Sequence, residues 1–195
     1  LHRRATVASF LEDYRQALLE LVDHCRNTSV TEKTPTDFTR CTLSLADYDA
    51  FLATTNWRPE DIADVYPLSS MQAGLLYQDT LDSDSAAYFL QMSFALKGTL
   101  DIDCFHSAWE EIVKRHEILR TAFVQEGLPE PLQVILKHRP PAFLVEDISS
   151  LPTTEQHRKI SDFCALDKER GFDLKEDSLV RFAVFRLDSK RHQVI

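Results

Sequence analysis

Glycine is scarce in this sequence: only Gly74, Gly98, Gly127 and Gly171 occur among its 195 residues. Phosphate-binding loops and dinucleotide-binding turns need several glycines close together, because their backbone turns tightly and approaches the phosphates. Four isolated glycines cannot build either, so nucleotide binding is disfavoured. No serine lies in a Gly-x-Ser-x-Gly turn, and a serine nucleophile is not expected.

Cysteine and histidine are too dispersed for a metal or redox site. None of the cysteines forms the close pair that zinc sites and redox motifs require. We expect buried free thiols in a cytoplasmic protein, because oxidising compartments favour denser cysteine frameworks. No histidine pair at i, i+4 shares an expected helix face with a carboxylate, so no metal is expected. The cysteines are Cys25, Cys41, Cys104 and Cys164, and the histidines are His2, His24, His106, His116, His138, His157 and His192.

The sequence also lacks an excess of basic residues and any long apolar run. The chain has 22 Lys and Arg against 31 Asp and Glu, a formal charge of -9, which disfavours nucleic acid and anionic membrane surfaces as partners. No apolar stretch approaches the roughly 20 residues needed to cross a bilayer. The first residues contain neither a starting Met nor a signal-peptide core, which indicates a piece of a longer chain.

The N-terminal part predicts a helix followed by a linker. Apolar residues recur at three- and four-residue spacing over Thr6–Cys25, so one amphipathic helix is expected to end near Asn27 and to pack on residues upstream of this chain. Residues 28–61 are expected to be an interdomain linker. It contains one short helix, begun by Ser44 with Asp47 three residues on. Trp57–Pro67 is expected to be a second connector.

From residue 62 onward, helical and strand patterns alternate. Ser69 and Gln72 form a capping box that opens a helix over Met71–Thr80, and two further helices are expected, one over Phe105–Leu119 and one over Thr153–Arg170, the latter ended by Gly171. This mixture predicts an α/β (α+β) fold with a mixed sheet and flanking helices. Strands are expected over Tyr88–Leu96, Arg120–Val124, Leu132–Leu136, Ala142–Val145, Leu179–Leu187 and His192–Ile195.

Charge is concentrated where the Phe105–Leu119 helix passes into the Arg120–Val124 strand. Arg115 and His116 lie in the last helical turn, where cations favour the negative end of the helix dipole. Arg120 falls on the strand face opposite Leu119, and a half-buried guanidinium normally needs a carboxylate partner. Structural ion pairing and direct chemistry both remain open for Arg120.

Two strings in this sequence resemble core motifs of the condensation domains of nonribosomal peptide synthetases. Tyr66-Pro67-Leu68-Ser69-Ser70-Met71-Gln72-Ala73-Gly74-Leu75-Leu76 resembles the first motif. Arg115-His116-Glu117-Ile118-Leu119-Arg120-Thr121-Ala122-Phe123, which begins 43 residues after Gln72, resembles the second. The stretches Phe172-Asp173-Leu174 and Leu179-Val180-Arg181-Phe182 resemble the approach to the third. The resemblance covers about residues 62–195.

The resemblance implies the N-terminal lobe of a chloramphenicol-acetyltransferase-like fold, in which two lobes enclose a tunnel. There, thioesters on carrier domains would be joined by an amide bond. Phosphopantetheine would be carried by the partner carrier domains, and no cofactor would be bound directly. The family's third motif, His-His-x-x-x-Asp-Gly, does not occur in this sequence, so no catalytic residue is assigned. Arg115 and Arg120 match arginines that hold the catalytic loop, and Ser69, Gln72 and Gly74 mark the first motif.

The first 56 residues are similar to the end of an epimerization domain, through the helix ending His24-Cys25 and the run Thr34–Phe38. That order implies a donor with a D-configured residue. The expected domains are therefore 1–27, the last helix of the preceding domain, 28–61, the linker, and 62–195, the condensation lobe. Without a carboxylate partner in this chain, Arg120 is expected to shift or to face water. The alternatives are a non-catalytic module that docks carrier proteins, a small acyltransferase of the same superfamily, and a domain with a degenerate catalytic motif.

Overall fold

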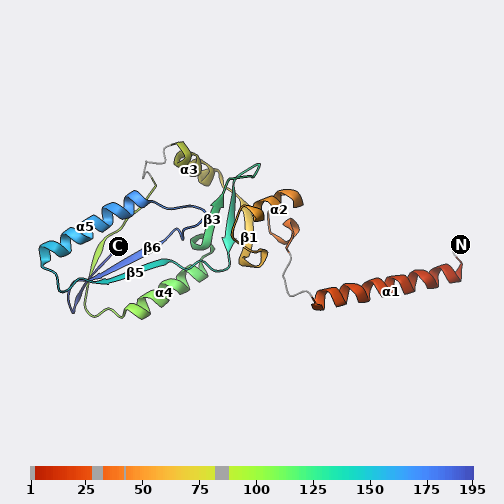
Figure 1. Cartoon of the computed structure of the whole chain (residues 1–195), viewed down its shortest axis with the longest axis horizontal. Coiled ribbons are helices and arrows are strands. Elements are labelled where there is room, and N and C mark those ends of the chain that lie inside the picture. Colours follow the sequence, from red (N-terminus) through yellow and green to blue (C-terminus); the bar gives the residue numbers. More distant parts are fainter. Residues whose placement is uncertain (1–2, 28–32, 42, 82–87) are drawn as a thin grey trace. The chain divides into compact units, whose positions relative to one another are not determined.

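The computed structural model describes residues 3–27, 33–41, 43–81 and 88–195, and the chain divides into two units, Leu1–Lys33 and Thr34–Ile195. The first unit contains one helix, α1 (Arg4–Asn27), as the apolar spacing predicted (Figure 1). All its residues are exposed, including Phe10 and Leu21 at 67% and 59%. The partner expected to cover its apolar side chains stays a prediction.

The segment from Thr34 to Asp61 packs into the second unit. It contains η1 (Pro35–Asp37), α2 (Leu45–Ala53) and η2 (Pro59–Asp61). Ser44 caps α2 as predicted, because its Oγ accepts the amide of Asp47 at 3.2 Å. From Thr34 on, the expected linker is packed against the lobe, because α2 and the residues before it contribute to the core. The buried residues of this segment are Phe38, Leu43, Tyr48 and Phe51.

A three-stranded antiparallel sheet receives these side chains. Its order is β1 (Ile62–Pro67), β4 (Leu132–Leu136) and β3 (Thr121–Val124). The expectation of a connector over Trp57–Pro67 is wrong for its last six residues, which form β1. A register shift between Ile62 and Asp64 leaves the buried residues Ile62 and Val65 three positions apart, so the alternation that indicates a strand is missing.

A second, four-stranded sheet has the order β2 (Phe94–Lys97), β7 (Arg191–Val194), β6 (Arg181–Arg186) and β5 (Ala142–Asp147). β5 and β6 are parallel and the other pairs antiparallel, which confirms a mixed sheet. The strand expected over Tyr88–Leu96 forms only from Phe94. Alternating residues before Phe94 have no neighbouring strand, and Leu90 is 82% exposed.

Helices cover both faces of the second sheet, which lies between α4 (Ile102–Arg115) and α5 (Thr153–Arg170) in Figure 1. Trp109 of α4 packs on Phe182, with ring centroids 4.1 Å apart. Phe163 of α5 packs on Phe185 at 5.2 Å. Since residues three positions apart in a strand face opposite sides, the two helices lie on opposite faces of β6.

Glycine and a short 3-10 turn end two of the helices. Gly171 follows α5 with φ of 61°, and so ends it as predicted. After α4, η3 (Glu117–Arg120) intervenes before β3, so the expected direct passage from helix to strand is wrong. Arg120 consequently belongs to the turn and does not lie on the strand.

The cysteine thiols are free, as expected, but the expectation that they are buried is wrong for two of them. Cys25 and Cys104 are exposed, whereas Cys41 and Cys164 are partly buried. Within the described ranges, no helix has both the length and the apolar character to cross a membrane.

Candidate functional site

The first-motif residues form a capped helix end that is attached to β4. The amide of Ser69 donates to Oε1 of Gln72 at 2.8 Å, and the amide of Gln72 donates to Oγ of Ser69 at 3.3 Å, which confirms the capping box at α3 (Ser70–Leu81). Nε2 of Gln72 also donates to Oε1 of Gln133 at 3.0 Å, and Gln133 donates to the carbonyl of Pro67. Gly74 is exposed, and apart from its chain neighbours and the nearby backbone of α3 no atom lies within 4 Å of an added Cβ.

The second-motif arginines lie in different environments. Arg115 is the last residue of α4 and is exposed. Arg120 is 9% exposed, so the expectation that it faces water is wrong. Its Nε donates to the carbonyl of Val113 at 3.1 Å, and its Nη1 donates to the carbonyl of Leu136.

Carbonyl groups stabilise Arg120 where a carboxylate was expected. In α4, the carbonyl of Val113 would accept from the amide of residue 117, which lies beyond the helix end. The guanidinium satisfies this orphan acceptor and also donates to the carbonyl of Leu136 at the end of β4. Because hydrogen bonds to a charged donor are strong, the two carbonyls stabilise the buried cation without an acidic side chain.

The two motif segments therefore attach to the same strand. Gln72 reaches Gln133 and Arg120 reaches Leu136, and both partners belong to β4. Arg115 does not take part in these contacts. β4 is thus the element that fixes the first- and second-motif segments relative to each other.

Arg139 was not singled out by the sequence, yet it is 6% exposed and joins two distant segments. Its Nη1 donates to the carbonyl of Thr121 and its Nη2 to the carbonyl of Lys175, each at 2.7 Å. Burial lowers the pKa of this guanidinium, and the nearby charges of Asp177, Glu176 and Asp173 oppose that effect. No periodicity marks Arg139, because it precedes Pro140 and Pro141 in a connection between strands.

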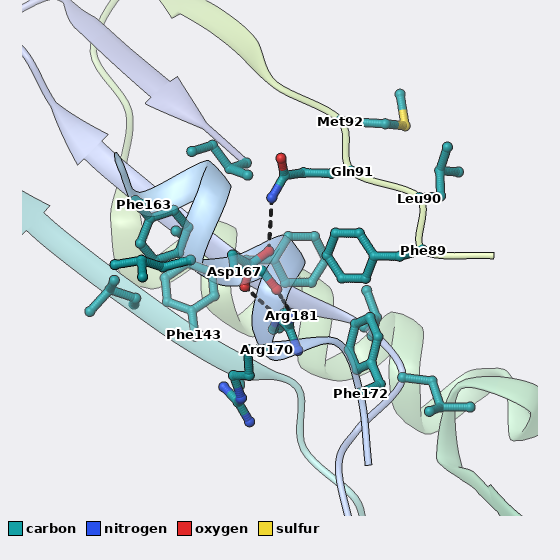
Figure 2. A pocket seen from close by; sticks show the side chains of 18 of the residues that line it. Phe89, Leu90, Gln91, Met92, Phe143, Phe163, Asp167, Arg170, Phe172 and Arg181 are labelled. Atoms are coloured by element: carbon teal, nitrogen blue, oxygen red, sulfur yellow. Dashed lines mark hydrogen bonds and ion pairs between the residues drawn. The ribbon is translucent and has the colours of Figure 1, made fainter. Parts of the chain in front are cut away.

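A cavity of about 890 Å³ lies beside the second sheet. Its walls are mainly apolar and aromatic, and come from the segment before β2, from α4 and α5, and from β5 and β6 (Figure 2). Among the described residues that line it, none is one of the five site residues expected from the sequence. The sequence signals for this site are the run of apolar residues from Tyr88 and the stretch from Phe172 to Phe182. Labelled wall residues include Phe89, Phe143, Phe163 and Phe172.

A partly buried ion pair lies among these apolar walls. Nε of Arg181 donates to Oδ1 of Asp167 at 2.6 Å, and both side chains are 11% exposed. Nη1 and Nη2 of Arg181 donate to the carbonyls of Gly171 and Asp167, and its guanidinium lies 4.1 Å from the ring centroid of Phe172. Gln91 completes the network through its bond to Oδ2 of Asp167 at 2.9 Å (Figure 2).

Each guanidinium nitrogen of Arg181 already donates to an acceptor within the protein. The network is therefore poorly suited to bind a polar ligand. The ion pair holds the end of α5 on β6 and fixes the segment that contains Gln91. In the part of the chain that the structure describes, no group of three His, Cys, Asp or Glu residues could hold a metal ion.

Comparison with known proteins decides the family. The family model described as "Condensation domain" matches residues 62–195. The chain belongs to the condensation domain family. The resemblance carried by the two motif segments is thereby confirmed.

Its curated relatives are much longer proteins. The chain is 34% identical over its whole length to a mycosubtilin synthase polypeptide of Bacillus subtilis, of which it covers 7%. It is 32% identical over its whole length to bacitracin synthase 1 of Bacillus licheniformis, of which it covers 4%. The chain thus spans less than a tenth of either relative.

Two solved structures, one of them a condensation domain, have the same fold. The starter condensation domain of rhizomide synthetase superposes with a TM-score of 0.60 at 17% identity, over 68% of this chain and 32% of that chain. The tallysomycin biosynthesis protein TlmII superposes with a TM-score of 0.55 at 23% identity, over 67% of this chain and 32% of that one. The predicted mixed α/β lobe of a condensation domain is confirmed.

Proposed function

We propose that this chain is part of a nonribosomal peptide synthetase, in which residues 62–195 form the N-terminal lobe of a condensation domain that makes amide bonds. The acceptor amine would attack the donor thioester carbonyl, a new C–N bond would form, and the phosphopantetheine thiol of the donor carrier domain would leave. Family membership over residues 62–195 is the observation that carries this proposal. The attachment of both motif segments to β4 supports it.

The chain's own residues would support the reaction centre without performing the chemistry. Arg120 keeps the second-motif segment in place through Val113 and Leu136, and in the complete domain it would hold the catalytic loop together with Arg115. Ser69, Gln72 and Gly74 would form part of the wall near the first motif. This piece alone would be inactive, since the His-His-x-x-x-Asp-Gly motif is not in its sequence.

The residues before the condensation lobe would connect it to an upstream epimerization domain. α1 would be the last helix of that domain, and residues 28–61 would join the two domains while packing on the second from Thr34 on. The donor would then end in a D-residue. Adjacent synthetase domains and carrier domains are the partners in this arrangement, which would work in the cytoplasm, where free thiols persist.

A second candidate function is a non-catalytic module that docks carrier proteins. The exposed apolar side chains of α1 favour association with another protein domain. This candidate would need no amide-forming activity anywhere in the parent protein.

Turnover by the parent synthetase distinguishes the two functions. The parent protein, supplied with ATP and the 20 amino acids, should accumulate an amide-linked product on its downstream carrier domain, detected by intact mass spectrometry. Residues 1–195 added to the same loaded carriers should form none. If the carriers are loaded and no amide product forms, the proposed condensation function is contradicted. The preference for a D-configured donor is tested by charging the donor carrier with the L-amino acid. If the L-form reacts as fast as the D-form, that preference is contradicted.

A further inference from the structure

Arg139 lies where the chain passes from one sheet to the other. It is in the five-residue connection between the end of β4, at Leu136, and the start of β5, at Ala142. Its two terminal nitrogens bind the carbonyl of Thr121, the first residue of β3, and the carbonyl of Lys175, in the connection between α5 and β6. One side chain thus joins the first sheet to the connection that leads into the second.

The connection that contains Lys175 is also attached to the first sheet and to the end of α2. The amide of Phe123 in β3 donates to the carbonyl of Leu174 at 2.9 Å. Nζ of Lys175 donates to the carbonyl of Thr54, after α2, at 2.7 Å. Phe172 and Leu174 in the same connection line the cavity beside the second sheet. Arg139 therefore acts together with the bonds of Phe123 and Lys175 in placing this cavity wall relative to β3.

The geometry requires an arginine. A guanidinium presents two parallel N–H groups in a rigid plane, so it can bind two carbonyls at once, whereas a lysine ammonium is a single point charge on a flexible stem. Arg139 is buried, and its hydrogen bonds to Thr121 and Lys175 both go to carbonyls. Burying a cation costs free energy. The hydrogen bonds to the two carbonyls offset that cost.

We propose that Arg139 is a positioning residue for the condensation reaction, because its guanidinium fixes the second-motif segment, at Thr121, against the connection at Lys175 whose Phe172 and Leu174 line the cavity. This inference rests on the proposed function. Loss of the bridge would let this connection shift relative to Thr121 while each sheet keeps its own hydrogen bonds. A displacement of about 1 Å in a reaction centre is enough to slow chemistry by up to about 100-fold.

The test uses the parent synthetase with Arg139→Met, which keeps the length of the side chain and removes its donors. Single-turnover amide formation between preloaded carrier domains should slow by about tenfold or more, while carrier loading stays unchanged. Arg186→Met is the matched control, because Arg186 is exposed and its contact with Asp147 spans 3.4 Å. The control should keep the rate of the unmodified protein.

Arg139→Lys separates positioning from stability. It retains the charge and can reach one carbonyl, so its urea midpoint should lie close to that of the unmodified protein, yet its amide-forming rate should stay as low as that of Arg139→Met. Hydrogen exchange should rise in residues 171–178 of both variants. Rates that follow the urea midpoints across the variants, or an unchanged rate in Arg139→Lys, would overturn the inference. An unmodified synthetase that makes no amide contradicts the proposed function instead, and the exchange measurement still tests the bridge.

Discussion

Arg181 and Arg186 begin and end β6, and each has an aspartate partner in a different environment. The pair of Arg181 with Asp167 is 2.6 Å long, with both side chains 11% exposed. The pair of Arg186 with Asp147 is 3.4 Å long, with exposures of 50% and 53%. Since water and salt screen exposed charges, we expect only the less exposed pair, Arg181 with Asp167, to contribute to stability.

Asp167→Asn should lower the free energy of unfolding by about 3 kcal/mol, because it leaves the Arg181 cation buried without its countercharge. The value lies at the low end of the range for broken buried pairs, since the carbonyls of Gly171 and Asp167 still accept from Arg181. Urea unfolding at pH 7 measures it. Asp147→Asn is the control and should leave the urea midpoint where it is. Equal midpoints for the two variants would contradict the distinction.

At the scale of elements, helices and their caps were predicted from the sequence better than strands. Ser44 and the Ser69–Gln72 pair act locally, so their sequence pattern suffices. A strand depends on a neighbour that the sequence does not indicate: β1 was missed because of its register shift, and the pattern before Phe94 has no partner. Arg139 and the Asp167–Arg181 pair join residues far apart in the chain, and no local pattern marks them.

Replacement of Gly171 or of Gly74 by alanine should change the stability of the protein in opposite directions. Gly171 has φ of 61°, where an L-residue is strained, so Gly171→Ala should destabilise the protein by about 1–2 kcal/mol. Gly74 lies within α3 with open space around it, so Gly74→Ala should stabilise by up to about 1 kcal/mol through helix propensity. Thermal unfolding followed by circular dichroism tests both. A loss of stability in Gly74→Ala would show a close contact at this first-motif position that the structure lacks.

At the scale of the whole molecule, the folding unit begins before the family match. The match starts at residue 62, but Phe38, Tyr48 and Phe51 are buried against the first sheet. Tyr48 and Phe51 are 1% and 0% exposed, and their rings lie 6.0 Å apart. A lobe that begins at residue 62 would expose the face of the sheet that these side chains cover.

Truncation tests this boundary. Residues 34–195 should unfold in urea at the same midpoint as the whole chain, because no residue of α1 is buried. Residues 62–195 should not unfold cooperatively, since replacing even one buried aromatic side chain by alanine costs about 3–5 kcal/mol. Within α2, Phe51→Ala should show that loss, whereas Leu45→Ala, at 58% exposed, should leave the midpoint unchanged. A cooperative transition of residues 62–195 at the midpoint of residues 34–195 would mean that α2 packs on a core that is complete without it.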